Sequence, residues 1–291
     1  MPVQYGLLTK EQLHDLVPLL PDIEQAASAE NIYAIGAAKA DRICGVLVFR
    51  ADRELLIDIQ YIAVAEACRR QGIANGLLDF LCKRAWETTT AVLCTFAAAS
   101  WDDPLCSLFV RRGDFTLMEA EGYICRFPCK ALSQVELSAV PPAGARIAAF
   151  YDLPEWARRR FLKEMKSDNP ELSAGLCNEP EQMLRPLCLC AVDSAENIRA
   201  AIFCQGRGRD VELSLAYGTP NHTRSLVALV GRLRELLLSA GERVSFLRIA
   251  AVTPQSQKLV DMLLPAREIT ERFYTACWDM TEIGGQDDVH E

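Results

Sequence analysis

The chain has 291 residues and a formal net charge of −8, from 39 acidic and 31 basic side chains. A negative chain of this kind repels nucleic acid and anionic membrane surfaces, so we expect neither as a partner. No apolar run reaches the length of a membrane span, and residues 1–13 lack the basic and apolar parts of a signal peptide. We therefore expect a cytoplasmic protein, large enough for one or two well-packed domains.

The twelve cysteines are scattered through apolar runs, where a free cysteine behaves as a small hydrophobic residue. The sequence has no Cys-x-x-Cys pair, and its three histidines, His14, His222 and His290, are isolated from one another. This pattern predicts free thiols and no metal site.

The hydrophobic pattern of the first 130 residues predicts alternating helices and strands. Thr9 is the expected N-cap of the first helix, and Glu121-Gly122 is expected to turn the last two strands into a hairpin. The expected helices cover residues 10–17, 23–27, 73–87 and 104–112. The expected strands cover residues 31–37, 43–49, 55–64, 91–98, 115–120 and 123–128.

Residues 57–81 run from a strand through a short polar loop into an amphipathic helix. Unpaired N–H groups and the positive end of the dipole make such a helix N-terminus an anion site. Gly72 would let a ligand approach the backbone closely, and the preceding arginines would neutralise a phosphate. The loop consists of Arg69, Arg70, Gln71 and Gly72.

This stretch resembles the acyl-CoA loop of the GCN5-related N-acetyltransferase (GNAT) family, whose signature is Arg/Gln-x-x-Gly-x-Gly/Ala, five residues after the last hydrophobic residue of a strand. Here Val64 is that residue, and Arg69, Gly72 and Ala74 fill the three places. The alternative is an ordinary strand-to-helix connection with a glycine at the turn. The element order extends the resemblance over residues 1–130. It implies acetyl-CoA as co-substrate, bound by Ile62, Ala63, Val64, Arg69, Arg70, Gln71, Gly72, Ile73, Ala74 and Asn75.

The resemblance also implies residues for transfer of an acyl group to an amine. In the family, a carboxylate six residues before the last hydrophobic residue of the strand often serves as the general base, and here that position is Asp58. Gln60, on the same face, would orient a water molecule or the substrate. The alternative is that Asp58 is a solvated strand residue or the partner of a nearby arginine.

The position of the general acid departs from the family pattern. The family has Asn, Tyr and Gly in its second motif, whereas this chain has Asp102, Phe109 and Gly113, so the hydroxyl that would protonate the thiolate is absent. Tyr123 is the expected substitute, with Tyr274 as the other candidate. Unassisted departure of the thiolate and an inactive acyl-CoA-binding domain are the alternatives. Asp102 is expected to hold a cationic amine, unless it caps the helix that follows.

The second half repeats the order of elements after a Pro- and Gly-containing stretch at residues 131–144. Expected helices cover residues 155–165, 179–184, 223–238 and 254–264, and expected strands 187–192, 199–204, 211–216, 244–250 and 273–278. We therefore expect two tandem GNAT domains of mixed α/β fold, each with a mostly antiparallel sheet flanked by helices. The expected boundaries are a GNAT domain at 1–132, a linker at 133–145 and a degenerate copy at 146–291.

The second copy lacks the phosphate loop. Aligning residues 221–227 with residues 68–74 places no glycine in the loop and puts Val227 where a small residue is needed. Arg224 remains, and His222 fits a residue near a helix N-terminus better than a catalytic base.

The sequence thus predicts an acetyl-CoA-dependent N-acetyltransferase that acts on the primary amine of a small molecule. A cationic acceptor agrees with the negative charge of the chain. The alternative is a catalytically impaired acyl-CoA-binding or regulatory protein with a GNAT-like interaction domain, and a third hypothesis makes the second domain the catalytic one. A homodimer is one assembly left open.

Overall fold

A computed structural model describes residues 2–14, 16, 31–40, 42–51, 56–85, 89–168, 183–219, 222–264 and 266–279. The chain divides into two compact units. Unit 1 comprises residues 1–120 and 272–291, and unit 2 comprises residues 121–271. In the described part of the chain, no helix combines the length and the apolar character that crossing a membrane requires.

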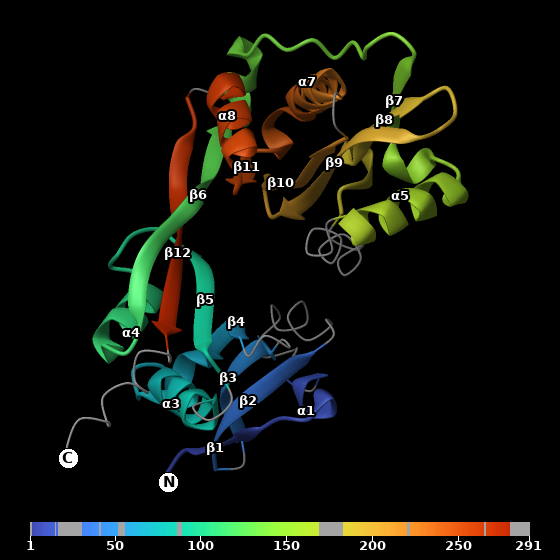
Figure 1. Cartoon of the computed structure of the whole chain (residues 1–291). Helices are drawn as coiled ribbons and strands as arrows, with labels where there is room; N and C mark the ends of the chain where they lie inside the picture. The colour runs from blue at the N-terminus through green and yellow to red at the C-terminus, as the bar shows by residue number, and fades with distance from the viewer. Residues whose placement is uncertain are drawn as a thin grey trace, which may run out of the picture. The chain divides into compact units, whose positions relative to one another are not determined.

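Unit 1 contains most of the elements expected in the first half of the chain (Figure 1). They are β1 (Gln4–Leu7), α1 (Lys10–His14), β2 (Ile32–Lys39), β3 (Arg42–Ala51), β4 (Leu56–Val64), η1 (Glu66–Cys68), α3 (Ile73–Ala85), β5 (Ala91–Ala98) and α4 (Pro104–Arg112). Two long strands, β6 (Thr116–Pro128) and β12 (Glu268–Asp279), contribute to both units.

The sheet of unit 1 has the strand order β1-β2-β3-β4-β5-β12-β6. Its pairs from β1 to β4 are antiparallel, β4 and β5 are parallel, and β5 and β12 are antiparallel again. Alternate residues of β3 face opposite sides of this sheet, as the period of a strand requires. Leu47 packs with Leu77 of α3 on one side, whereas Val46 packs with Leu13 of α1 on the other.

Unit 2 repeats this plan with the strand order β12-β6-β11-β10-β9-β8-β7. Helices α7 and α8 cover one face and α5 covers the other, because Ile202 of β9 packs with Leu229 of α7 while neighbouring Phe203 packs with Phe161 of α5. Besides β6 and β12, the elements are η2 (Cys129–Gln134), β7 (Ala145–Ala149), η3 (Phe150–Asp152), α5 (Glu155–Asp168), η4 (Arg185–Leu187), β8 (Leu189–Asp193), β9 (Ile198–Arg207), β10 (Asp210–Gly218), α7 (Thr223–Ala240), η5 (Gly241–Arg243), β11 (Phe246–Ala251) and α8 (Pro254–Leu263).

The expected hairpin at Glu121-Gly122 is wrong, because β6 is one continuous strand from Thr116 to Pro128. Gly122 has a φ of 102° within that strand. Its conformational freedom lets the chain continue where the sequence suggested a turn. The strand that pairs with β5 is instead β12, from the other end of the chain (teal β5 and red β12 in Figure 1).

The contact pattern also divides the chain at positions other than the expected ones. The two compact units are divided inside β6 and β12, after residues 120 and 271. The domain boundaries expected at residues 132 and 146 stay a prediction. Residues 133–138 of the expected linker pack on α7. Gly231 of α7 lies so close to Ser138 that a Cβ there would be 2.6 Å from the Ser138 carbonyl oxygen.

Most other elements lie within a few residues of their expected bounds, but two short strands, β1 and β7, were not expected. The helix expected at 23–27 and residues 179–182 of another lie outside the described residues. Every cysteine in the described ranges is a free thiol, and nearly all are buried, as expected.

Candidate active site

The sheet of unit 1 opens after Asp58. The parallel pairing of β4 with β5 ends at the Asp58–Leu93 pair. Beyond it, β4 continues along β3 to Val64, whereas β5 continues along β12. The two strands therefore part, and the last residues of β4 have β3 as their neighbour on one side only.

A β-bulge lies at the point where the strands part. Tyr61 pairs with Val48 and Ile59 pairs with Phe49, so Gln60 is the extra residue on β4. The Gln60 amide donates a hydrogen bond to the Asp58 carboxylate. The two expected site residues are thus in contact, although the sequence pattern gave no sign of the bulge.

Asp58 also forms an ion pair. Its Oδ2 lies 3.5 Å from Nη2 of Arg50 on the neighbouring strand, and 27% of its side chain is exposed. The structure therefore shows the arginine partner that was the alternative hypothesis for Asp58. The carboxylate also keeps access to water, which a proton acceptor needs.

Alternation along β4 decides which backbone groups face the opening. The Ala65 N–H donates to the Cys44 carbonyl of β3 at 2.9 Å. Because alternate residues of an antiparallel pair face the same neighbour, Ala63 also directs its backbone groups to β3, while Ile62 and Val64 direct theirs to the open side. Of the three expected strand contacts to acetyl-CoA, Ile62 and Val64 thus have backbone groups on the open side.

The loop after β4 presents open backbone at the N-terminus of α3. Gly72 has a φ of 78°, and a Cβ there would meet no atom within 4 Å. The first backbone hydrogen bond of the helix runs from Gly76 N–H to the Gly72 carbonyl at 3.0 Å. The N–H groups of Ile73, Ala74 and Asn75 precede it and have no acceptor within the helix, so this turn is a good place for phosphate oxygens.

Close packing at two glycines holds α3 in this position. A Cβ on Gly45 would lie 2.8 Å from Ile73 Cγ2, and a Cβ on Gly76 would overlap the Tyr5 ring. Helix and sheet thus touch where a larger side chain would push the loop away. Tyr5 comes from β1, which was not expected, so sequence reasoning missed this contact.

Three basic side chains belong to the loop and its surroundings. Arg69 donates from Nε to the Val64 carbonyl at 3.1 Å, and Arg70, with a φ of 62°, is exposed. Lys39, from the end of β2, donates from Nζ to Oε1 of Gln71 at 3.0 Å. Lys39 is separated from the loop by about thirty residues, so no local pattern could have revealed it.

Residue 109, where the family has the tyrosine that acts as general acid, lies in the core of unit 1. Phe109 is fully buried and its ring stacks on Phe96 at 5.7 Å. Tyr274 of β12 pairs with Phe96 across the ladder, and its ring also lies 5.0 Å from that of Trp101. Burial raises the pKa of Tyr274, so it keeps its proton at neutral pH. Tyr274 is the candidate acid that the structure places in the same unit as Asp58.

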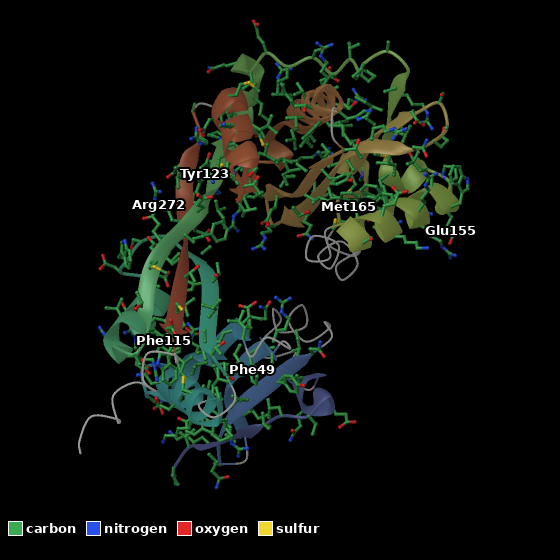
Figure 2. The ribbon with its side chains drawn as sticks, in the orientation of Figure 1. Phe49, Phe115, Tyr123, Glu155, Met165 and Arg272 are labelled. Atoms are coloured by element: carbon green, nitrogen blue, oxygen red, sulfur yellow. The ribbon has the colours of Figure 1, made fainter. Side chains whose placement is uncertain are left out.

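Tyr123, the other candidate, lies on β6 (Figure 2), in the part of that strand that belongs to unit 2. Its hydroxyl donates to Oδ1 of Asp261 at 2.9 Å, and Arg267 lies over its ring. Burial and then the bond to Asp261 raise the pKa of Tyr123. Within unit 2, Tyr123 thus has its own carboxylate partner, Asp261.

The N-cap of α4 is Asp103, whose Oδ1 accepts from the Leu105 N–H at 2.9 Å. Asp102 is an exposed turn residue, and its own N–H donates to Ser100 Oγ at 3.3 Å. Its carboxylate is therefore not the cap of the helix. Trp101 beside it is half exposed.

The sheet of unit 2 also opens, between β10 and β11, but the loop from β10 to α7 is shorter than the loop from β4 to α3. The Thr219 N–H donates to the Arg199 carbonyl of β9 at 2.9 Å, which corresponds to the bond from the Ala65 N–H to the Cys44 carbonyl in unit 1. Residues 66–72 then lead to α3, whereas only residues 220–222 lead to α7. The loop has thus lost four residues, which the ungapped alignment with residues 221–227 did not reveal. Asn221 in that alignment lies outside the described residues.

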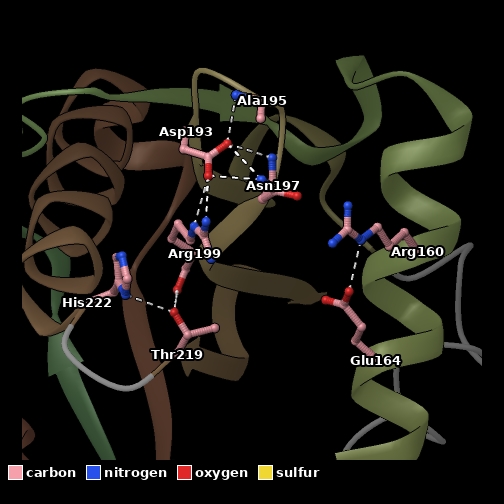
Figure 3. A network of polar contacts seen from close by, with 8 residues as sticks. All are labelled: Arg160, Glu164, Asp193, Ala195, Asn197, Arg199, Thr219 and His222. Carbon is pink, nitrogen blue, oxygen red and sulfur yellow. Dashed lines mark hydrogen bonds and ion pairs between the residues drawn. The ribbon is translucent and has the colours of Figure 1, made fainter.

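His222 is the N-cap residue of α7, and its Nδ1 lies 3.0 Å from Oγ1 of Thr219 (Figure 3). Thr219 Oγ1 in turn lies 3.1 Å from the Arg199 carbonyl oxygen. His222 is thus part of a local structural contact at the helix terminus. Among the described residues, no three His, Cys, Asp or Glu side chains come together as a metal-binding group.

Comparison with known proteins shows a family match in the first half of the chain and a fold match over nearly all of it. Residues 7–113 match the model of the acetyltransferase (GNAT) family. No curated protein matches the sequence. A tandem GNAT protein from the clavulanic acid biosynthesis pathway is 13% identical, with a TM-score of 0.63 over 96% of this chain and 99% of that chain. A GCN5-related N-acetyltransferase from Sphaerobacter thermophilus is 12% identical, with a TM-score of 0.54 over 96% of both chains. These likenesses confirm the expected fold class.

Proposed function

We propose that unit 1 transfers an acetyl group from acetyl-CoA to a primary amine of a small molecule, because residues 7–113 match the model of the acetyltransferase (GNAT) family and the chain has the tandem form of that fold. The observation that carries this proposal is the open backbone at Gly72, at the mouth of the parted strands β4 and β5. Helix dipole, free amides and basic side chains all favour a phosphate there.

The pyrophosphate of acetyl-CoA lies over the loop in this proposal. The N–H groups of Gly72, Ile73, Ala74 and Asn75 bind its oxygens, and Arg69, Arg70 and Gln71 surround it. The pantetheine arm follows the open edge of β4, where the backbone groups of Ile62 and Val64 are the hydrogen-bonding partners, in the manner of a strand added to the sheet.

In the reaction, the amine nitrogen bonds to the thioester carbonyl carbon and the carbon–sulfur bond breaks. The attacking nitrogen must lose a proton, and we assign this proton to Asp58, reached through a water molecule. The contacts of Asp58 with Arg50 and Gln60 hold the carboxylate in one orientation. Such a base contributes about 10²–10⁴-fold to a rate.

The departing thiolate takes its proton from Tyr274 or from water. A thiol with a pKa of about 8.5 is a good leaving group at neutral pH, so the phenylalanine at position 109 slows the reaction without preventing it. The acceptor amine binds near Gln60 and Asp102, whose carboxylate attracts a cation.

A second candidate function is acyl-CoA binding without turnover. The full burial of Phe109 against Phe96 favours it, because the usual position of the acid is filled by core packing. Binding and turnover must therefore be measured separately.

The test is to incubate the full chain with acetyl-CoA and a panel of primary amines, and to measure both the release of free thiol and the mass of the acetylated product. Gly72→Val should abolish acetyl-CoA binding in calorimetry. Gly113→Val is the matched control, because Gly113 has a φ of 76°, close to that of Gly72, and equally open surroundings. Equal loss of binding in both variants would show that backbone strain alone is responsible. Binding without product for any amine would favour the second candidate.

A further inference from the structure

A partly open apolar cavity of about 190 Å³ lies in unit 2. It occupies the place where β10 and β11 part, because their parallel pairing ends at Leu213 and Ile249 while β10 continues along β9. Helices α7 and α8 close it. Its lining is mostly leucine and valine, including Leu213, Val230, Leu233, Leu247, Leu259 and Val260.

One charged side chain, Arg234 of α7, lines this cavity. Its Nε donates to the Leu132 carbonyl at 2.7 Å and its Nη2 lies 3.4 Å from the Ser133 carbonyl. Within the described part of the chain it has no carboxylate partner. A guanidinium has five N–H donors and a full positive charge, so it retains donors and charge for an anionic group.

The strand edge adds a polar backbone position. The N–H of Thr219 donates to β9. Backbone groups alternate in direction along a strand, so those of Ala216, three residues earlier, point away from β9. They face the side where β11 no longer pairs with β10. Ala216 lines the cavity. The site therefore combines an apolar interior, one backbone donor and acceptor, and a single cation.

A coenzyme does not fit these features. The connection to α7, residues 220–222, is four residues shorter than the loop of unit 1 and contains no glycine, so the site for a pyrophosphate has been lost. An apolar cavity of about 150 Å³ holds benzene, so this larger one accepts a short alkyl chain or an aryl group. We propose that unit 2 binds a small apolar carboxylic acid, with its chain among the leucines and its carboxylate on Arg234.

The test uses octanoate and 1-octanol, which share a chain and differ in charge, in calorimetric titrations of the full chain. Octanoate should bind more tightly than 1-octanol. Arg234→Gln should weaken octanoate binding about tenfold, the effect of one charge-assisted hydrogen bond, and leave 1-octanol binding unchanged. Val230→Trp should fill the cavity and abolish binding of both. Val227→Trp, on the same helix but outside the cavity lining, is its control and should bind both ligands normally.

Three results would overturn the proposal. The first is no octanoate binding to the folded wild-type chain, and the second is unchanged binding in Val230→Trp. The third is competition between octanoate and saturating acetyl-CoA, which would place octanoate in the site of unit 1. The experiment measures octanoate binding to unit 2. A finding that unit 1 does not transfer acetyl groups would therefore leave this proposal intact.

Discussion

The Nε of Arg69 donates a hydrogen bond to the carbonyl oxygen of Val64, 3.1 Å away. This bond joins the first residue of the loop to the last residue of β4 and so ties the loop before α3 to the open strand edge. One side chain thus has two roles, because the guanidinium keeps further donors and its charge for a ligand.

We expect Arg69→Ala to weaken acetyl-CoA binding about 10- to 100-fold, since it removes a charge-assisted contact and the bond that orders the loop. Calorimetry with acetyl-CoA measures the effect. Arg111→Ala is the control, because Arg111 is an exposed cation in the last turn of α4 and its loss changes the net charge equally. Equal weakening in both variants would mean that only the overall charge matters.

Asp58→Asn should lower kcat by about 10²–10⁴-fold and leave acetyl-CoA affinity nearly unchanged, because asparagine keeps the shape but cannot take a proton. The alternative role, pairing with Arg50, predicts that Arg50→Gln has the same effect. Steady-state kinetics of both variants separate the two roles. Full turnover of Asp58→Asn would leave attack by an already deprotonated amine as the mechanism.

Tyr274→Phe and Tyr123→Phe should differ in their effects. Tyr274 shares unit 1 with Asp58, so losing its hydroxyl should lower kcat at most about 10²–10⁴-fold if it protonates the thiolate. Tyr123 donates to Asp261 in unit 2, so its replacement should lower the melting temperature by a few degrees and leave kcat unchanged. A larger fall in kcat for Tyr123→Phe would restore Tyr123 as the acid.

Stability should depend on pH through Asp193 in unit 2 (Figure 3). The side-chain bond from Asn197, together with the Arg199 guanidinium, holds the pKa of Asp193 well below its usual range. Because the folded pKa lies below the unfolded value of about 3.9, the stabilisation is present above pH 4 and is lost as the pH falls further.

Asp193→Asn should therefore lower the melting temperature by a few degrees at pH 7 and by less at pH 3. Thermal unfolding at both pH values measures the difference. Glu164→Gln is the control, because Glu164 pairs with Arg160 on the exposed face of α5, where an ion pair contributes little. If Asp193→Asn lowered the melting temperature equally at both pH values, the low pKa of Asp193 would not be the cause.

The sequence by itself determined the elements whose causes are local. The strand Ala91–Ala98 and the helix Pro104–Arg112 have the bounds that apolar runs and an N-terminal proline predicted, and the loop before Ile73 lies at a helix N-terminus as expected. Hydrophobic period, caps and a glycine act over a few residues, so they can be read without knowing the partners.

Tertiary structure alone decided which distant segments meet. Gly122 was expected in a turn, yet the strand runs through it because β12, some 150 residues later, supplies the neighbour of β5. Because β12 pairs with β5, Tyr274 belongs to unit 1, whereas Tyr123, in the second half of β6, belongs to unit 2. The bulge at Gln60 and the contact of Lys39 with the loop likewise depend on pairing between strands. Strand pairing is satisfied by backbone groups that every residue carries, so side-chain patterns do not specify the partner.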